Sequence, residues 1–252
     1  MRRIVFFLMA VLLFSACSKE EKSTVVDWEG NEYKTKNYGG TWWMVENLRT
    51  TRANNGQNIW VSSDDDAHSY TTPYCYFVND DEKDLKKRGC LYNWSAAQQV
   101  CPEGWHLPTT ADYEALTTYM RSVKKYGYKG NSNAIAKAMA AKTVWAKCDS
   151  AGTPGNGYKG AGGAIGPFVV VVDDVNIPSN NASGFNAMPV GYYTPLINNC
   201  FGKYSIEANF WLADEVDNNN ARIFGLVYNE PDVVECDADK SFGRSVRCVK
   251  NE

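Results

Sequence analysis

The stretch that decides the fold is residues 91–120, LYNWSAAQQVCPEGWHLPTTADYEALTTYM. Its first ten residues place Trp94 and Val100 on one side of a helical wheel, which predicts a helix over that segment. Thr109 followed by Asp112 is similar to a capping box and predicts the start of a second helix. The apolar spacing of this second helix is typical of a face packed on the core rather than of a cofactor site.

Short strands are predicted on both sides of these helices. Before them, residues 32–35 and 41–45 flank the turn at Gly39 and Gly40. An Ala-rich segment at 131–143 predicts a third helix. After it, apolar runs between Gly, Asn and Asp turns predict strands at 168–172, 184–193, 210–212, 222–228, 233–236 and 242–249. Helices in the middle and antiparallel strands at both ends, beside a loop-rich half, predict an α+β fold.

The first residues form an export signal. A basic start at Arg2 and Arg3 precedes an apolar run that is too short to span a membrane and fits a signal core. Ser15, Ala16 and Cys17 end it like a lipobox. We therefore expect residues 1–16 to be a lipoprotein signal peptide, cut before Cys17. The cysteine would then carry several acyl chains, palmitate among them, enough for stable anchoring. The alternative is an ordinary secretory signal in which Cys17 is incidental.

The residues after Cys17 are expected to form a lipidated tether over 17–24. They are polar and charged, and they lack residues that build a core. The same run resembles the export signal of surface lipoproteins in Bacteroidetes, and a generic spacer is the alternative. We expect an outer-membrane lipoprotein, with the surface-exposed and periplasmic orientations both open.

We expect the remaining chain, residues 25–252, to form one domain. Its composition limits the kinds of ligand that this domain is expected to bind. The full chain has 252 residues and a net charge of −3, without a basic cluster, which argues against nucleic-acid binding. Eight Trp, fifteen Tyr and ten Phe are more than a core of this size buries. Some are therefore expected at the surface, where aromatic side chains serve binding.

The eight cysteines of an exported chain favour disulfides over a metal site. If Cys17 is lipidated, an odd number remains, so at least one is a free thiol or is oddly paired. The only histidines are His68 and His106, and no Cys-x-x-Cys occurs, which argues against zinc.

Three blocks of the chain resemble the Fibrobacter succinogenes major paralogous domain, found in exported proteins of Bacteroidetes and Fibrobacter. They are residues 27–48, residues 75–109 with the run CPEGWHLPT, and residues 184–249 with the ending SVRCV. The resemblance covers about residues 25–250, with a variable insertion at about 125–165. It implies a fold similar to C-type lectins and formylglycine-generating enzymes. It also implies a disulfide between Cys101 and Cys248, which would stabilise the fold by about 4–5 kcal/mol.

Two further motifs suggest sites. Residues 229–232, Asn-Glu-Pro-Asp, resemble the calcium and sugar motif of C-type lectins. Glu230, Asp232, Glu235 and Asp237 could together supply oxygens to Ca²⁺, although a hairpin turn explains the same residues. Asp214–Asn220 is another oxygen-rich loop, for which a solvated loop is the simpler interpretation. Ser150, between Asp149 and Ala151, fits the O-glycosylation signal of exported Bacteroidetes proteins.

These observations lead to one functional expectation and two alternatives. We expect a lipid-anchored binding module of the cell envelope that recognises a glycan, a polysaccharide or a surface protein, without a cofactor unless calcium binds. An accessory or tip subunit of a surface appendage is the alternative. A hydrolase of envelope polysaccharides comes third, because the sequence contains no persuasive catalytic constellation.

Overall fold

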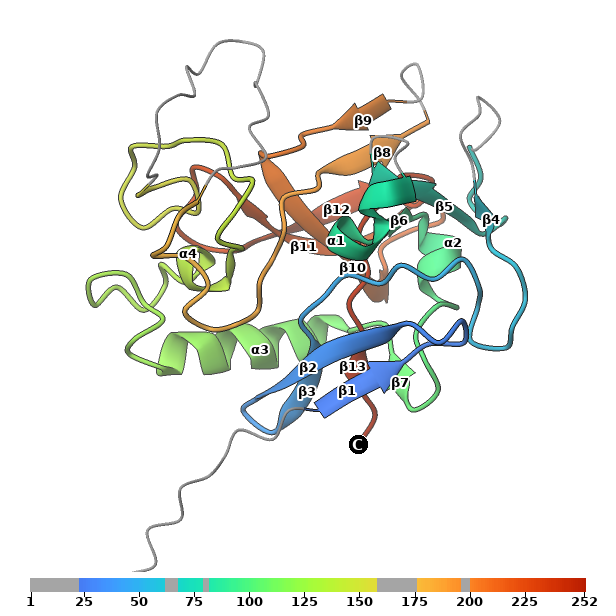
Figure 1. The fold of residues 1–252 in the computed structure, drawn as a ribbon, viewed down its shortest axis with the longest axis horizontal. Helices are drawn as coiled ribbons and strands as arrows, with labels where there is room; N and C mark the ends of the chain where they lie inside the picture. Colours follow the sequence, from blue (N-terminus) through green and yellow to red (C-terminus); the bar gives the residue numbers. More distant parts are fainter. Residues whose placement is uncertain (1–22, 62–67, 79–81, 158–175, 196–199) are drawn as a thin grey trace, which may run out of the picture.

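The computed structural model of the chain describes residues 23–61, 68–78, 82–157, 176–195 and 200–252 (Figure 1). The fold is mostly β, with 34% strand in four sheets and 15% helix in four short helices among the described residues. The expectation of an α+β, C-type-lectin-like fold with two or three helices in the middle is therefore wrong. The strands predicted at 32–35, 41–45, 210–212, 222–228 and 233–236 are present, whereas those predicted at 184–193 and 242–249 are strand only at their last residues. Two of the three predicted helices reduce to single turns.

The largest sheet has five strands and joins the two ends of the described chain. In spatial order they are β1 (Ser23–Val26), β2 (Glu32–Tyr38), β3 (Thr41–Met44), β13 (Val249–Lys250) and β7 (Trp105–His106). The predicted Gly39–Gly40 turn connects β2 to β3. The last strand of the chain lies between β3 and β7 (Figure 1).

Three smaller sheets complete the architecture. The first contains β10 (Glu207–Glu215), β11 (Asn220–Val227) and β12 (Val234–Asp239), which fall on three of the predicted strands. The second contains β4 (Trp60–Val61), β5 (Tyr74–Phe77) and β6 (Cys90–Tyr92), and the third pairs β8 (Tyr192–Thr194) with β9 (Cys200–Gly202). The strand predicted at 168–172 lies outside the described residues.

Only α3 (Thr110–Ser122) is a helix of several turns. It begins with the predicted capping box, in which Thr109 and Asp112 exchange hydrogen bonds. The helix predicted over 91–100 shrinks to α2 (Trp94–Ala97), because the residues before it pair with β5 and Asn93 caps its first turn.

The Ala-rich helix predicted at 131–143 shrinks to α4 (Ala136–Met139). Ala140 and Ala141 leave the helix because both join Ala187, through a parallel bridge and a hydrogen bond of 2.7 Å from the Ala141 N–H. Short helices depend on tertiary packing for their stability, so such contacts override propensity. A 3-10 turn (Glu82–Asp84) and α1 (Leu85–Arg88) precede β6.

Arg247 is 1% exposed and packs against two aromatic rings of one apolar cluster. Its guanidinium lies 4.7 Å from the ring of Phe185 and 4.9 Å from that of Phe210. It donates to Asn47 Oδ1 at 2.8 Å, to the Asn186 carbonyl at 2.8 Å and to the Phe185 carbonyl. Burial lowers the pKa of Arg247 to about 9. The arginine of the SVRCV ending thus ties the end of the chain to residues 185–186 through their backbone carbonyls.

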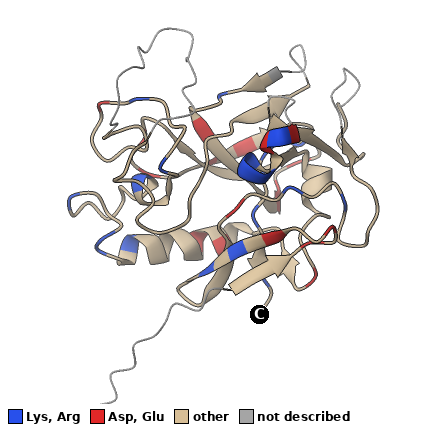
Figure 2. Cartoon of the chain, in the orientation of Figure 1, with Lys and Arg blue, Asp and Glu red and all other residues tan. Residues whose placement is uncertain are grey.

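Charged residues are interspersed rather than gathered by sign: β2, α3 and the 3-10 turn each carry both acidic and basic positions, whereas α1 carries basic ones alone (Figure 2). No helix among the described residues combines the length and the apolar character that crossing a membrane requires.

Candidate functional site

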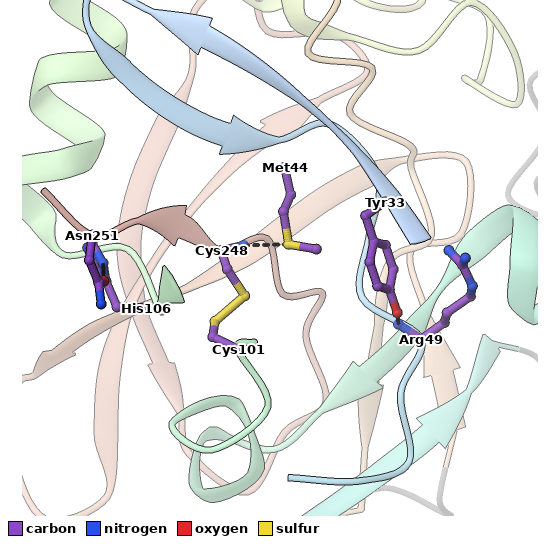
Figure 3. The surroundings of a disulfide bond; sticks show 7 residues. All are labelled: Tyr33, Met44, Arg49, Cys101, His106, Cys248 and Asn251. Atoms are coloured by element: carbon purple, nitrogen blue, oxygen red, sulfur yellow. Dashed lines mark hydrogen bonds between the residues drawn. A yellow bond between two sulfur atoms is a disulfide. The ribbon is translucent and has the colours of Figure 1, made fainter. Parts of the chain in front are cut away.

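A disulfide joins Cys101 to Cys248, 147 residues apart in sequence and 5.7 Å apart between Cα atoms (Figure 3). It is the pairing that the family resemblance implies. The neighbouring strand β3 supports it, since the Cys248 N–H donates to Met44 Sδ at 3.3 Å and the Cys248 carbonyl accepts from the Met44 N–H. The bond fixes β13 within the five-stranded sheet.

The four acids predicted to bind calcium do not converge. Asp232 forms an ion pair of 3.0 Å with Arg121, and Glu235 and Asp237 face Arg222 at 3.4 and 3.3 Å. Within the described ranges, no group of three or more His, Cys, Asp or Glu side chains is arranged to hold a metal ion. Arginines are the partners of three of the proposed ligands, and Glu230 lies in the turn between β11 and β12.

Two lysine ammonium groups lie where oxygen-rich loops converge. Lys240 is 3% exposed and donates to the Glu215 carboxylate and to the carbonyls of Asp217 and Asn218, in the loop that the sequence marks as oxygen-rich. Lys137 is 6% exposed and donates to Asn180 Oδ1 at 2.8 Å and to two loop carbonyls, those of residues 153 and 156. Burial lowers the pKa of Lys137 to about 8.

Of the two predicted modification sites, Ser150 lies among the described residues and Cys17 does not. Ser150 is exposed in a turn, where its carbonyl accepts a 2.8 Å hydrogen bond from Thr153 Oγ1. Its hydroxyl group is therefore on an accessible segment. Cys17 and most of the tether lie outside the described residues.

The exposed apolar side chains point to a different region. Among the described residues, four of the five large hydrophobic side chains that are strongly exposed belong to two short segments, 26–28 and 60–61. Trp28 is 60% exposed and Trp60 is 66% exposed. Exposed amide side chains lie between them in sequence. We call this set the tryptophan face; it consists of Trp28, Asn54, Asn55, Gln57, Asn58 and Trp60.

Asp27 holds the turn that carries Trp28. Its carboxylate accepts hydrogen bonds from the backbone of Glu29 and Asn31, both at 2.9 Å, and from the Tyr33 hydroxyl at 2.6 Å. Burial raises the pKa of Tyr33, and the neighbouring Asp27 carboxylate raises it further. The Tyr33 hydroxyl therefore stays protonated and donates its hydrogen bond to Asp27. Arg49 covers the Tyr33 ring at 4.3 Å, and its N–H donates to the same hydroxyl (Figure 3).

Glu29 joins this turn to the segment that begins the neighbouring loop. Its carboxylate accepts from Thr50 Oγ1 at 3.0 Å and from the N–H and Oγ1 of Thr51 at 2.8 and 2.7 Å. Arg52 Nε lies 3.8 Å away. Partial burial would raise the pKa of Glu29, but the threonine hydrogen bonds and the Arg52 charge outweigh it, and the pKa is lowered. The carboxylate therefore remains ionised and acts as a clamp between the two segments.

Buried anchors hold the loop of the tryptophan face. Ala53 is 1% exposed and Ile59 is 3% exposed, and both belong to one apolar cluster. The N–H of Ala53 donates to the Gln57 carbonyl, which closes the loop. Gly56 adopts φ +84°, and a Cβ there would lie 2.7 Å from the Trp28 ring. The indole thus rests on a glycine that cannot be enlarged without moving it.

Trp60 is held by strand pairing. It lies on β4, which runs parallel to β5 with Trp60 opposite Tyr74, and its N–H donates to the Pro73 carbonyl at 3.1 Å. The backbone is thereby fixed while the indole remains exposed. Sequence reasoning left residues 52–72 as a polar loop and missed this site. The available signal was a tryptophan directly after a run rich in Asn and Gln.

Two cavities lie elsewhere. One, of about 690 Å³, is lined by side chains of both charges, including Lys34, Glu46 and Arg49. The other, of about 360 Å³, lies beside β13 and is lined by Trp42 and by His106, whose ring nitrogens contact Asp112 Oδ2 at 3.1 Å and Asn251 Oδ1 at 2.7 Å (Figure 3). Neither cavity is lined by Trp28 or Trp60.

The tryptophan face offers two exposed indoles on backbone segments held by hydrogen bonds, and amide groups that both donate and accept hydrogen bonds. Such a surface suits a ligand with apolar C–H faces and many hydroxyl groups. A family model described as the Fibrobacter succinogenes major domain matches residues 37–250, which include Trp60 and the disulfide and begin after Trp28. No curated protein and no solved structure matches the chain.

Proposed function

The chain belongs to the Fibrobacter succinogenes major domain family, and from this premise we propose that it is a cell-envelope binding module whose tryptophan face binds a glycan. The single observation that carries the proposal is the exposure of Trp28 and Trp60 on a loop system whose backbone is held by buried anchors and by the Glu29 clamp. Exposed apolar surface rimmed by polar residues often marks a site of contact with a partner.

A glycan is favoured over a surface protein by the residues between the two indoles. Asn54, Asn55, Gln57 and Asn58 are all exposed. The core of a protein–protein interface is usually a continuous apolar patch, whereas a sugar presents both a C–H face for stacking and hydroxyl groups for amides. The fixed backbone also lowers the entropy that is lost on binding.

A lipid anchor at Cys17 would place this domain a short tether away from a bacterial membrane. The described residues begin at Ser23, on β1, so the last two residues of the expected tether belong to the first strand. The appendage and hydrolase hypotheses stay predictions from the sequence, and no arrangement of the described side chains argues for either.

The test is a glycan array probed with the full chain in detergent, followed by calorimetry on any saccharide that binds. We expect Trp28→Ala and Trp60→Ala each to weaken binding by about tenfold, because a lost stacking contact is worth roughly 1.4 kcal/mol. Trp42→Ala is the matched control, since Trp42 lines the cavity beside β13.

Three outcomes would contradict the proposal. One is an array without any binding. Another is binding that the double variant Trp28→Ala/Trp60→Ala leaves unchanged. The third is binding lost only in Trp42→Ala, which would move the site to the cavity that contains His106.

A further inference from the structure

Two buried thiols lie on adjacent strands beneath the tryptophan face. In the β5–β6 ladder, Cys75 is opposite Tyr92 and Cys90 is opposite Phe77. Antiparallel partners project to the same side of a sheet, so Cys75 and Cys90 share one face and are diagonal neighbours. Both are 0% exposed.

Both residues lie in the same apolar cluster as the Cys101–Cys248 disulfide. Burial first, and the neighbouring Cys75 thiol after it, raise the pKa of the Cys90 thiol. The chain therefore packs four cysteines into one cluster, of which one pair is joined and the other is only adjacent.

We propose that Cys75 and Cys90 form a second disulfide when the chain folds in an oxidising compartment. The existing disulfide already indicates such a compartment, since structural disulfides persist where thiols are not kept reduced. Diagonal neighbours across a ladder lie about 7–8 Å apart, somewhat beyond the span of a disulfide, so forming the bond requires the backbones of β5 and β6 to move toward each other.

The reaction is a thiol–disulfide exchange with an oxidised dithiol oxidoreductase. The thiolate of one cysteine attacks the enzyme's disulfide, forms a mixed disulfide and releases one enzyme thiolate. The second cysteine thiolate then attacks the mixed disulfide, forms the Cys75–Cys90 bond and releases the enzyme as a dithiol. The protein loses two electrons and two protons, and the enzyme gains both. Because the folded thiols are inaccessible, exchange occurs before β5 and β6 close.

The proposed bond has a mechanical consequence for the binding face. β4 pairs with β5, and Val61 is opposite Cys75 in that register. The cross-link would therefore fasten β5 to β6 directly beside the strand that carries Trp60. It would also enclose the segment that contains α1 in a covalent loop.

The test is peptide mapping of the full chain after refolding in a glutathione redox buffer until Cys101 and Cys248 are recovered as a linked peptide. Free thiols are alkylated at low pH in denaturant, and the protein is digested without reduction. We expect a peptide pair joined through Cys75 and Cys90, lighter by two hydrogens than the sum of the two. The Cys101–Cys248 pair serves as an internal control for oxidation.

A melting experiment provides a second measurement. Oxidised Cys75→Ala/Cys90→Ala should melt several degrees below oxidised Cys236→Ala, which removes an exposed free cysteine instead. The difference should shrink when both variants are reduced. Alkylated Cys75 and Cys90 in a sample with Cys101 linked to Cys248, or Cys75 linked to any other cysteine, would overturn the proposal.

Discussion

Replacing Gly56 with alanine tests how the tryptophan face is built. Gly56 has φ +84°, and the added Cβ would meet the Trp28 ring at 2.7 Å. Ordinary contacts of this kind are about 3.5–4.0 Å, so the indole must move by roughly 1 Å. Gly130 is the matched control, because it has φ +86° and nothing within 4 Å of the same position.

Both substitutions carry the same backbone penalty, and only one displaces Trp28. A left-handed alanine costs about 1–2 kcal/mol, so both variants should lose that much free energy of unfolding in urea titrations. Only Gly56→Ala should shift tryptophan fluorescence and weaken saccharide binding, by about tenfold if one stacking contact is lost. Equal saccharide binding by Gly56→Ala and Gly130→Ala would refute the inference that Gly56 holds the Trp28 indole in its binding position.

Three further predictions concern stability. Removing the disulfide with Cys101→Ala/Cys248→Ala should cost about 5 kcal/mol, as expected for closing a loop this long, and lower the melting temperature by roughly 10–20 °C in calorimetry; a loss below 1 kcal/mol would show that the bond is not a main constraint. Glu29→Ala should cost about 1–2 kcal/mol at neutral pH through its lost hydrogen bonds. Because folding lowers the pKa of Glu29, this contribution is present above the unfolded value of about 4.3 and is lost as the pH falls through the folded pKa, so urea titrations of both proteins should converge in acid. Lys137 has a folded pKa of about 8, below its unfolded value of about 10.4, so stability should rise with pH between these values by less than about 1.4 kcal/mol per pH unit. Lys137→Met should lack that slope, and parallel pH profiles of the two proteins would contradict the assignment.

The sequence predicts features set by local chemistry and fails where distant contacts decide. The Thr109–Asp112 box predicts the start of α3, and the turn at Gly39–Gly40 predicts the β2–β3 hairpin, because both depend on neighbouring residues. The helices at 91–100 and 131–143 fail because β5 and Ala187 compete for their backbone groups. The family resemblance supplies the disulfide, which spacing alone does not determine.

The candidate site likewise depends on contacts between residues that are distant in sequence, which the local sequence does not predict. Glu29 and Thr51 are 22 residues apart, and their contact depends on how two loops fold together. Nothing in the local sequence indicates that the Trp28 ring rests on Gly56. The composition of residues 230–237 suggests a calcium site, yet arginines on α3 and β11 pair with three of the acids.

The lysine-centred loops have a consequence for the conditions under which this domain folds. A metal ion in a loop dissociates, and its occupancy depends on the concentration in the medium. Lys137 and Lys240 are covalently attached, so each loop receives its positive charge from the chain itself at a fixed effective concentration. Closing these loops is a unimolecular event that neither dilution nor a chelator can reverse. The positive charge in these two loops therefore does not depend on which ions the surrounding medium contains.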